Sequence, residues 1–234
     1  MKRLPVFALF FALWLSACGG GGTPDVPTSV TPTQPATDTP SSSPPATGVP
    51  AGETENVAPA ADDFFSQMGI ELPAPTCDGT LTLSQTEGPY YTPDTPERDS
   101  LLEPGMAGQR LILVGAVLDR DCQPIPNAWL DFWQADANGN YDNQGYTLRG
   151  HQFTDDQGRF HLETVVPGQY PGQTEHIHVK VQPPGGEILT SQLYFPDQDS
   201  ANRQDGIFDP SLLVQIEDRG DFLLAFFSFI VNGN

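Results

Sequence analysis

Two histidines separated by one residue, His176 and His178, stand in a segment whose polar and apolar residues alternate strictly from 176 to 181. This alternation has the period of a β-strand, so the two imidazoles point to the same side. Same-face neighbours on a strand lie roughly 6.5 to 7 Å apart, which lets both imidazoles turn toward one metal ion. The alternative is a strand whose polar face is open to water. His-x-His alone does not decide between them.

Two tyrosines that follow glycine-containing turns could complete such a site. Tyr141 comes after Asn138-Gly-Asn140, and Tyr170 comes after Pro167-Gly-Gln169. Taken singly, each is more typical of a structural tyrosine whose ring is in the core and whose hydroxyl is at the rim. As a group, two phenolates and two neutral imidazoles suit ferric iron, because a strong positive charge keeps phenolate ionised near neutral pH. Zinc sites prefer Cys, His and carboxylate.

Other kinds of chemistry lack their motifs. The sequence has no Gly-x-Ser-x-Gly, no glycine-rich phosphate loop, no Cys-x-x-Cys and no His-Glu-x-x-His. Nucleophilic hydrolysis and nucleotide chemistry therefore have no support. The formal net charge of −20 argues against nucleic acid and anionic membrane surfaces as partners.

Short apolar runs separated by Gly, Pro, Asn and Asp begin at about Pro73 and must position these side chains. This texture predicts an all-β sandwich of mostly antiparallel strands. No segment after residue 73 has a long and clear helical period, which argues against a parallel α/β sheet. The strands are expected at 109–119, 127–135, 159–165, 176–182, 188–195 and 222–231.

The N-terminus has the pattern of an export signal. Lys2 and Arg3 precede an apolar run at 4–15, and Leu15-Ser-Ala-Cys18 resembles a bacterial lipobox. We therefore expect cleavage before Cys18 and a lipid on its sulfur, which would anchor an exported protein in the bacterial cell envelope. A plain signal peptide with an incidental cysteine is the alternative.

Pro, Thr, Ser, Ala and Gly dominate the stretch after Cys18, which cannot bury enough apolar surface to fold. Within it, 62–72 is apolar enough to form a short helix or an extended strap on the domain. Contact with the membrane is then expected through the anchor only. The expected division is a signal peptide at 1–17, a lipid-anchored Pro/Thr/Ser-rich tether at 18–72 and a β-sandwich domain at 73–234.

Cys77 and Cys122 are the only cysteines besides Cys18. In an exported protein two remaining cysteines usually pair. The sequence therefore predicts a disulfide between Cys77 and Cys122.

Seven segments between Pro73 and Phe195, in this order, resemble the intradiol ring-cleavage dioxygenases, the family of catechol and protocatechuate dioxygenases. The resemblance implies the β-sandwich fold of that family. The segments are Glu87-Gly-Pro-Tyr-Tyr91, Asp131-Phe-Trp-Gln-Ala-Asp-Ala-Asn-Gly-Asn-Tyr141, Arg149-Gly150, Thr154-Asp-Asp-Gln-Gly158, Pro167-Gly-Gln-Tyr-Pro171, His176-Ile-His178 and Leu189-Thr-Ser-Gln-Leu-Tyr-Phe195.

The resemblance implies a non-haem Fe(III) centre with four protein ligands and a hydroxide. Ferric iron with two phenolates and one hydroxide has no net charge, as a low-dielectric site requires. When a catechol binds as a dianion, its two protons are implied to go to the hydroxide and to Tyr170, which both leave the iron, so that the sum of charges is again zero. The implied ligands are Tyr141, Tyr170, His176 and His178.

The implied reaction cleaves a small aromatic diol with O2 between its two hydroxyl-bearing carbons to give a cis,cis-muconate. Gln192 stands at the family's glutamine position near the substrate, and Tyr90, Tyr91 and Arg149 are expected to help bind it. Because the chain has only ten Lys and Arg residues, a neutral catechol is favoured over a carboxylated one. The sequence is also compatible with a homodimer.

One position departs from the family pattern. The family usually has an arginine three residues before the first histidine, and this chain has Gln173 there. Glutamine brings no cation and no planar fork, so it should stabilise charge on the ring less well. Arg149 or Lys180 could substitute for the missing arginine. Two alternatives therefore stand beside an active dioxygenase: an iron-binding relative with impaired catalysis, and a transthyretin-like binding module without a metal.

Overall fold

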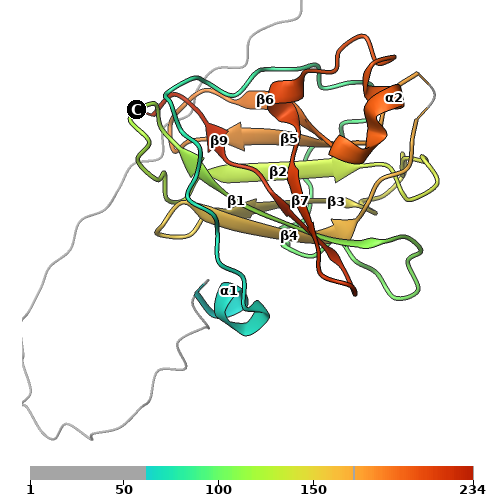
Figure 1. The fold of residues 1–234 in the computed structure, drawn as a ribbon, viewed down its shortest axis with the longest axis horizontal. Coiled ribbons are helices and arrows are strands. Elements are labelled where there is room, and N and C mark those ends of the chain that lie inside the picture. The colour runs from blue at the N-terminus through green and yellow to red at the C-terminus, as the bar shows by residue number, and fades with distance from the viewer. Residues whose placement is uncertain (1–61, 171, 234) are drawn as a thin grey trace, which may run out of the picture. The chain divides into compact units, whose positions relative to one another are not determined.

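The computed structural model describes residues 62–170 and 172–233. The expected signal peptide, Cys18 and the tether up to residue 61 lie outside these residues. In the part that is described, no helix is long and apolar enough to cross a membrane. The described residues form two β-sheets with a few short helices (Figure 1).

One sheet has four strands in the order β3-β2-β5-β6, and all its neighbours are antiparallel. The second sheet has the order β4-β1-β8-β7, with β9 pairing with β1. Only the pairs β1–β8 and β1–β9 are parallel in it. The strands are β1 (Arg110–Leu118), β2 (Trp129–Gln134), β3 (Arg149–Phe153), β4 (Arg159–Val165), β5 (His176–Gln182), β6 (Leu189–Tyr194), β7 (Gln215–Asp218), β8 (Leu223–Phe226) and β9 (Phe229–Ile230).

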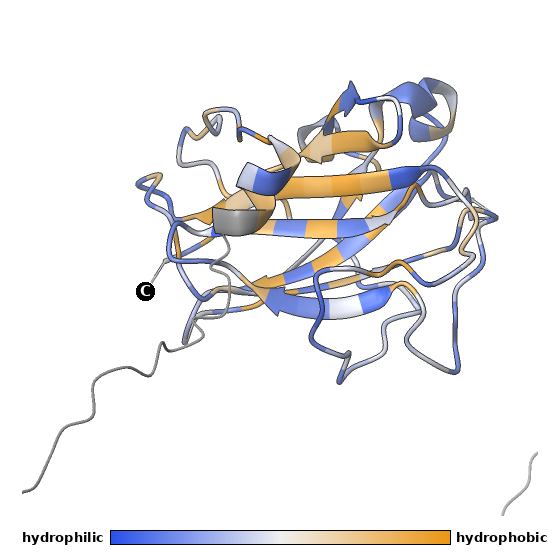
Figure 2. Ribbon diagram, turned by 90° about the horizontal axis from the view of Figure 1, so that it is seen from below, coloured by the Kyte–Doolittle hydropathy of each residue, from blue (hydrophilic) through white to orange (hydrophobic). Residues whose placement is uncertain are grey.

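The main core lies between the two sheets, and it confirms the expected all-β sandwich. On β5 the apolar side chains Ile177, Val179 and Val181 pack into this core with Leu111 and Leu113 of β1. Hydrophobic residues concentrate on the strands, and the loops are mostly hydrophilic (Figure 2). The opposite side chains of β5 therefore point to the outer face of the four-stranded sheet.

The expected strand at 222–231 is wrong as a single element. The run divides into β8 and β9 because Phe227 crosses directly over Gly115 of β1. A Cβ built on Gly115 would lie 1.6 Å from the carbonyl oxygen of Phe227. Strands β3 and β7 were not expected, because their sequences have little apolar alternation. The helices are α1 (Asp62–Met68), η1 (Pro196–Gln198), α2 (Asp199–Asn202) and η2 (Pro210–Leu212).

Of the two forms expected for 62–72, the structure shows a helix at 62–68. This helix packs on the outer face of the second sheet. Phe65 and Ile70 are buried against Ile112 and Val114 of β1. The expected domain boundary at residue 73 stays a prediction, because packing alone does not show where the tether ends.

The segment 72–91, which we call the strap, connects the two sheets. Cys77 forms the expected disulfide with Cys122 in the turn after β1, with their Cα atoms 5.8 Å apart. Further along, the Thr82 N–H donates to the carbonyl of Ile230 (2.9 Å) and the Gln85 N–H donates to the carbonyl of Thr190 (2.8 Å). The strap thus runs from β9 to β6 and reaches the outer face of the four-stranded sheet.

Candidate metal centre

The outer face of the four-stranded sheet holds His176 and His178, and it is not open to water. Each of these side chains is only 3% exposed. In the strand register, His178 lies between Trp133 on β2 and Gln192 on β6. The Trp133 ring stacks on the His178 ring, with centroids 4.7 Å apart and planes within 4°. The two imidazoles are therefore buried in a packed and largely polar layer.

The two histidine rings present ring nitrogens to the same point. Their Nε2 atoms are 3.0 Å apart, and the Tyr141 hydroxyl lies 3.3 Å from Nε2 of His176. Nδ1 of His176 is 2.7 Å from the carbonyl oxygen of Thr174, where its N–H donates and leaves Nε2 with a lone pair. Two ligands bound at right angles with bonds of about 2.1 Å would lie about 3 Å apart, so this spacing fits a shared metal ion.

The electrostatics of this buried layer favour neutral imidazoles. Burial lowers the pKa of His176 and lowers that of His178 further, with the charges of His176 and Arg149 adding to the effect on His178. Burial also raises the pKa of the Tyr141 hydroxyl, and Arg149 opposes this rise. Without a bound cation, Tyr141 is therefore a phenol, and the imidazoles are free to act as ligands.

Tyr170 lies beside this group in a different loop. Its ring is 6.1 Å from the Tyr141 ring in an edge-to-face arrangement, and its hydroxyl accepts a hydrogen bond of 2.7 Å from the Tyr90 hydroxyl. The Tyr90 ring in turn stacks on the Tyr141 ring at 4.4 Å. The four expected ligands are thus brought together from two turns and one strand, and Tyr90 covers the two tyrosines.

The turns that carry Tyr141 and Tyr170 pack backbone against backbone. The Gly168 N–H donates to the carbonyl of Asp136 (2.8 Å). A Cβ on Gly139 would lie 2.0 Å from the Gln169 carbonyl oxygen, and one on Gly168 would lie 2.6 Å from the backbone nitrogen of Gly139. Only glycine permits this approach at either position.

Changing Gly139 to alanine should therefore disturb both turns. Gly139 has a φ of +82° and the added Cβ would overlap a backbone oxygen, so we expect the free energy of unfolding to fall by about 3 kcal/mol. Chemical denaturation measures this loss. Gly105→Ala is the matched control, because Gly105 has a φ of +80° but no atom within 4 Å of an added Cβ. Equal losses in the two variants would show that the turn contact has no special importance.

The end of the strap covers the histidines. A Cβ on Gly88 would lie 3.4 Å from Cε1 of His178, so the Gly88 backbone packs on that ring. The Tyr91 hydroxyl donates to the carboxylate of Asp131 (3.0 Å), and its ring lies 4.8 Å from that of Trp133. Sequence reasoning gave no role to Trp133 or Asp131, although their alternate positions on one strand could have placed them on the face that carries the histidines.

The two glutamines of interest have different surroundings. Gln192 is fully buried; its Nε2 donates to the Thr86 carbonyl (3.1 Å) and its Oε1 accepts from the Tyr194 hydroxyl (2.9 Å). Gln173 is half-buried, and its backbone N–H donates to the Tyr170 carbonyl (2.9 Å). Gln173 and Tyr170 both line a cavity of about 420 Å³ that also contacts Gln204.

The two candidate substitutes for an arginine at 173 also differ. Lys180 already binds Glu87, with Nζ and Oε2 2.6 Å apart, and its Nζ lies 4.6 Å from the centre of the Tyr91 ring. Arg149 is 1% exposed and donates from Nε and Nη2 to the carbonyl of Asp142, the residue after Tyr141 (3.1 and 2.8 Å). Arg149 is the cation whose charge lowers the pKa of both Tyr141 and His178.

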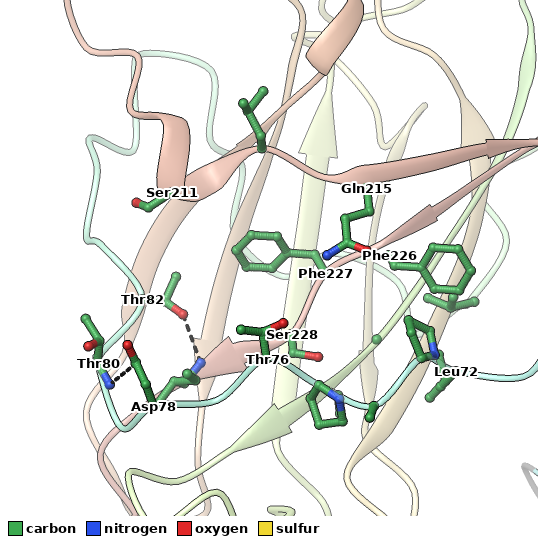
Figure 3. A pocket seen from close by; sticks show the side chains of 18 of the residues that line it. Leu72, Thr76, Asp78, Thr80, Thr82, Ser211, Gln215, Phe226, Phe227 and Ser228 are labelled. Carbon is green, nitrogen blue, oxygen red and sulfur yellow. Dashed lines mark hydrogen bonds between the residues drawn. The ribbon is translucent and has the colours of Figure 1, made fainter.

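A second cavity lies far from this chemistry. It has a volume of about 480 Å³ and lies between the strap and strands β1 and β8, where Phe226 and Phe227 line it (Figure 3). None of the expected site residues lines it. Within 62–170 and 172–233, no three His, Cys, Asp or Glu side chains are grouped to hold a metal ion. A metal ion on the outer face would therefore need the tyrosines as ligands.

Comparison with known proteins gives matches over the same part of the chain. Residues 86–209 match the profile of a protein family described as Dioxygenase. The solved dioxygenase domain of a dioxygenase–carbohydrate-binding protein fusion from Streptomyces sp. SirexAA-E is 46% identical, with a TM-score of 0.64, and the match covers 66% of this chain and 100% of that chain.

Curated relatives have lower identity. The protocatechuate 3,4-dioxygenase alpha chain of Pseudomonas putida is 31% identical over 169 residues, which are 62% of this chain and 82% of that protein. Catechol 1,2-dioxygenase of Candida albicans is 28% identical over 141 residues, which are 48% of this chain and 46% of that protein. The chain thus spans about half the length of the catechol 1,2-dioxygenases that it matches.

Proposed function

We propose, from the premise that this chain belongs to the intradiol dioxygenase family, that it is a non-haem Fe(III) enzyme which cleaves a catechol-type ring between its two hydroxyls with O2. The observation that carries the proposal is the meeting of His176, His178 and Tyr141 at one point, with Tyr170 beside Tyr141. Two imidazole nitrogens 3.0 Å apart and a phenol oxygen 3.3 Å from one of them form the donor set that ferric iron prefers.

Each residue has a part in this proposal that its contacts support. Tyr141, His176 and His178 would hold the ion, and Trp133 and Gly88 keep water from the His178 ring. Tyr170 is the ligand suited to leave, because its oxygen already accepts a hydrogen bond from Tyr90. A ferric ion held there would supply a Lewis-acid centre that makes a bound catechol reactive toward O2.

Purified protein loaded with Fe(III) should be red-brown from tyrosinate-to-iron charge transfer and should consume O2 with catechol. Mass spectrometry should then identify a ring-opened dicarboxylic acid that contains both atoms of ¹⁸O2. Protein loaded with Zn(II) is the control, and it should be colourless and inactive. Iron-loaded protein without the colour, or with an extradiol product, would refute the proposal.

A second candidate function, iron binding with weak catalysis, is favoured by Gln173. This residue lies beside Tyr170 and carries no charge. Gln173→Arg would place a cation at the cavity, so we expect kcat/KM for catechol to rise by about tenfold, which corresponds to about 1.4 kcal/mol of added transition-state stabilisation. Steady-state O2 uptake measures the change. Gln204→Arg, in the same cavity, is the control for a general charge effect, and an unchanged or slower Gln173→Arg enzyme would contradict the expectation.

The remaining parts of the proposal concern substrate and location. The cavity beside Tyr170 is lined by amides, one carboxylate and no Lys or Arg, which supports a neutral catechol over a carboxylated one. The lipid anchor at Cys18, export to the bacterial cell envelope and a homodimer stay proposals from the sequence. Metabolic labelling with a radioactive fatty acid, compared between the wild type and Cys18→Ser, tests the anchor.

A further inference from the structure

Lys180 is a nearly buried cation on the outer face of the four-stranded sheet. It is 9% exposed, and in the strand register it lies between Asp131 on β2 and Thr190 on β6. Its Nζ lies 2.6 Å from Oε2 of Glu87 and donates to the Thr190 hydroxyl (3.1 Å). The same Nζ lies over the Tyr91 ring, 4.6 Å from its centre. The charge of Lys180 is therefore directed at the strap, where an anion and an aromatic face compensate it.

Two contacts fasten the last part of the strap, residues 87–91, which we call the strap end. At its start Glu87 forms the ion pair with Lys180, and at its finish the Tyr91 hydroxyl donates to the carboxylate of Asp131 (3.0 Å). Lys180 and Asp131 are paired directly between β5 and β2, so their side chains point to the same face of the sheet. The two fastenings thus lie side by side, and Lys180 contacts the strap residue of each.

The residues between these fastenings contact the expected metal ligands. The Gly88 backbone packs on the His178 ring, where an added Cβ would lie 3.4 Å from Cε1. The Tyr90 hydroxyl donates to the Tyr170 hydroxyl (2.7 Å), and the Tyr90 ring stacks on the Tyr141 ring with centroids 4.4 Å apart. A short segment between two fixed points has little conformational freedom. The fastenings therefore decide where the Tyr90 side chain lies.

We propose that Lys180 is a positioning residue, which holds the strap end on the outer face so that the Tyr90 hydroxyl meets the oxygen of Tyr170. The importance of Tyr90 for a substrate rests on the proposed function, whereas its placement by Lys180 is a property of the iron-free protein as well. In this arrangement the Tyr91 hydroxyl serves Asp131, so Tyr91 anchors the strap end. Lys180 affects a bound catechol through Tyr90, and a substitution of Lys180 should lose what Tyr90 contributes.

Fluorine NMR of the iron-free protein labelled with 3-fluorotyrosine measures the placement of Tyr90 without a metal. The chain has six tyrosines, and Tyr90→Phe identifies the signal of Tyr90. Glu87→Gln breaks the ion pair from the strap side, where the Glu87 side chain is 47% exposed, so the fold should be kept. Lys180→Met breaks the ion pair from the sheet side. In both variants we expect the Tyr90 signal to move toward that of free 3-fluorotyrosine, because the ring loses its fixed stack on Tyr141.

Glu217→Gln is the matched control for the loss of an ion pair. Glu217 lies on β7 in the other sheet, its side chain is 54% exposed, and it pairs with Arg219 at 2.6 Å. This variant should leave the Tyr90 signal at its wild-type position, and Lys180→Arg, which keeps the charge, should restore that position. A Tyr90 signal that is unmoved in both Glu87→Gln and Lys180→Met overturns the role of Lys180, as does an equal movement in Glu217→Gln.

The consequence for the substrate is measured by adding catechol to iron-loaded protein without O2 and following the visible band. Tyr90→Phe should raise the apparent Kd of catechol by about fivefold, the effect of one lost hydrogen bond, because a Tyr170 that has left the iron then lacks its partner. Lys180→Met should have a similar effect, and the double variant should bind catechol no more weakly than the weaker single variant.

The outcomes separate the role of Lys180 from the proposed function. Effects of Lys180→Met and Tyr90→Phe that multiply in the double variant would show that Lys180 does not act through Tyr90, and they overturn the proposal. A wild type that binds no Fe(III) overturns the proposed function, and the fluorine signals then decide the placement of Tyr90 by Lys180 on their own.

Discussion

Replacing His178 with leucine should abolish the metal centre and lower the rate of catechol cleavage by at least about 1000-fold. This corresponds to a loss of about 4 kcal/mol in transition-state stabilisation. Leucine cannot coordinate, and the remaining histidine and tyrosines lose one of the two nitrogens that lie 3.0 Å apart. Changes to groups that only support ligands lower metal affinity or activity by about 10- to 100-fold, so loss of a ligand should lower them further. Iron content, the visible band and O2 uptake measure the effect.

The fold should survive this substitution. His178 is 3% exposed and its Nδ1 has no hydrogen-bond partner within the described residues, so an apolar side chain removes an unsatisfied buried nitrogen. Loss of the stacking with Trp133 costs about 1 kcal/mol in the opposite direction. We therefore expect the free energy of unfolding of the iron-free protein to change by less than about 2 kcal/mol.

His161→Gln is the control for the general loss of an imidazole. His161 lies on β4 in the other sheet, where its Nε2 is 3.2 Å from Asp99. This variant should keep the band and the activity of the wild type. If His178→Leu bound Fe(III) with an unchanged spectrum, the assignment of His178 as a ligand would be wrong.

The alternation around His176 and His178 was enough to predict β5 with its bounds at 176–182, because the strand is local and its two faces differ in polarity. The turns that carry Tyr141 and Tyr170 were also readable, since glycine and proline mark them. The alternation also allowed a strand whose polar face is open to water, and this alternative is wrong. The strap and the side chains of β2 cover that face, and such coverage depends on contacts between residues far apart in the chain.

The surroundings of the expected ligands were much harder to predict for the same reason. Trp133 reaches His178 only through the pairing of β2 with β5, and Arg149 reaches the same row through β3, a strand with little apolar alternation. The Gly139 and Gly168 contact joins two turns that are about thirty residues apart. The sequence therefore predicts the candidate ligands, whereas the residues that surround them become known only from the fold.

Removing the disulfide should cost about 4 kcal/mol of unfolding free energy. Cys77 and Cys122 are 45 residues apart, and the chain-entropy model gives this value for a loop of that size. For a domain of this size the melting temperature should fall by roughly 8 to 16 °C. Thermal and chemical unfolding of Cys77→Ala/Cys122→Ala measure both quantities. Wild-type protein in reductant should match the variant, and reductant should have no further effect on the variant.

The disulfide variant also separates the strap from the metal ligands. Cys77 fixes the start of the strap, whereas the four expected ligands are on β5 and on two turns that Gly139 and Gly168 join. At a temperature where the variant is folded, the tyrosinate-to-iron band should therefore remain. Catechol turnover should fall more than iron binding, because Gly88 and Tyr90 reach the site from the other end of the strap. Loss of iron from a folded variant would show that the strap holds the ligands themselves, which their present contacts do not predict.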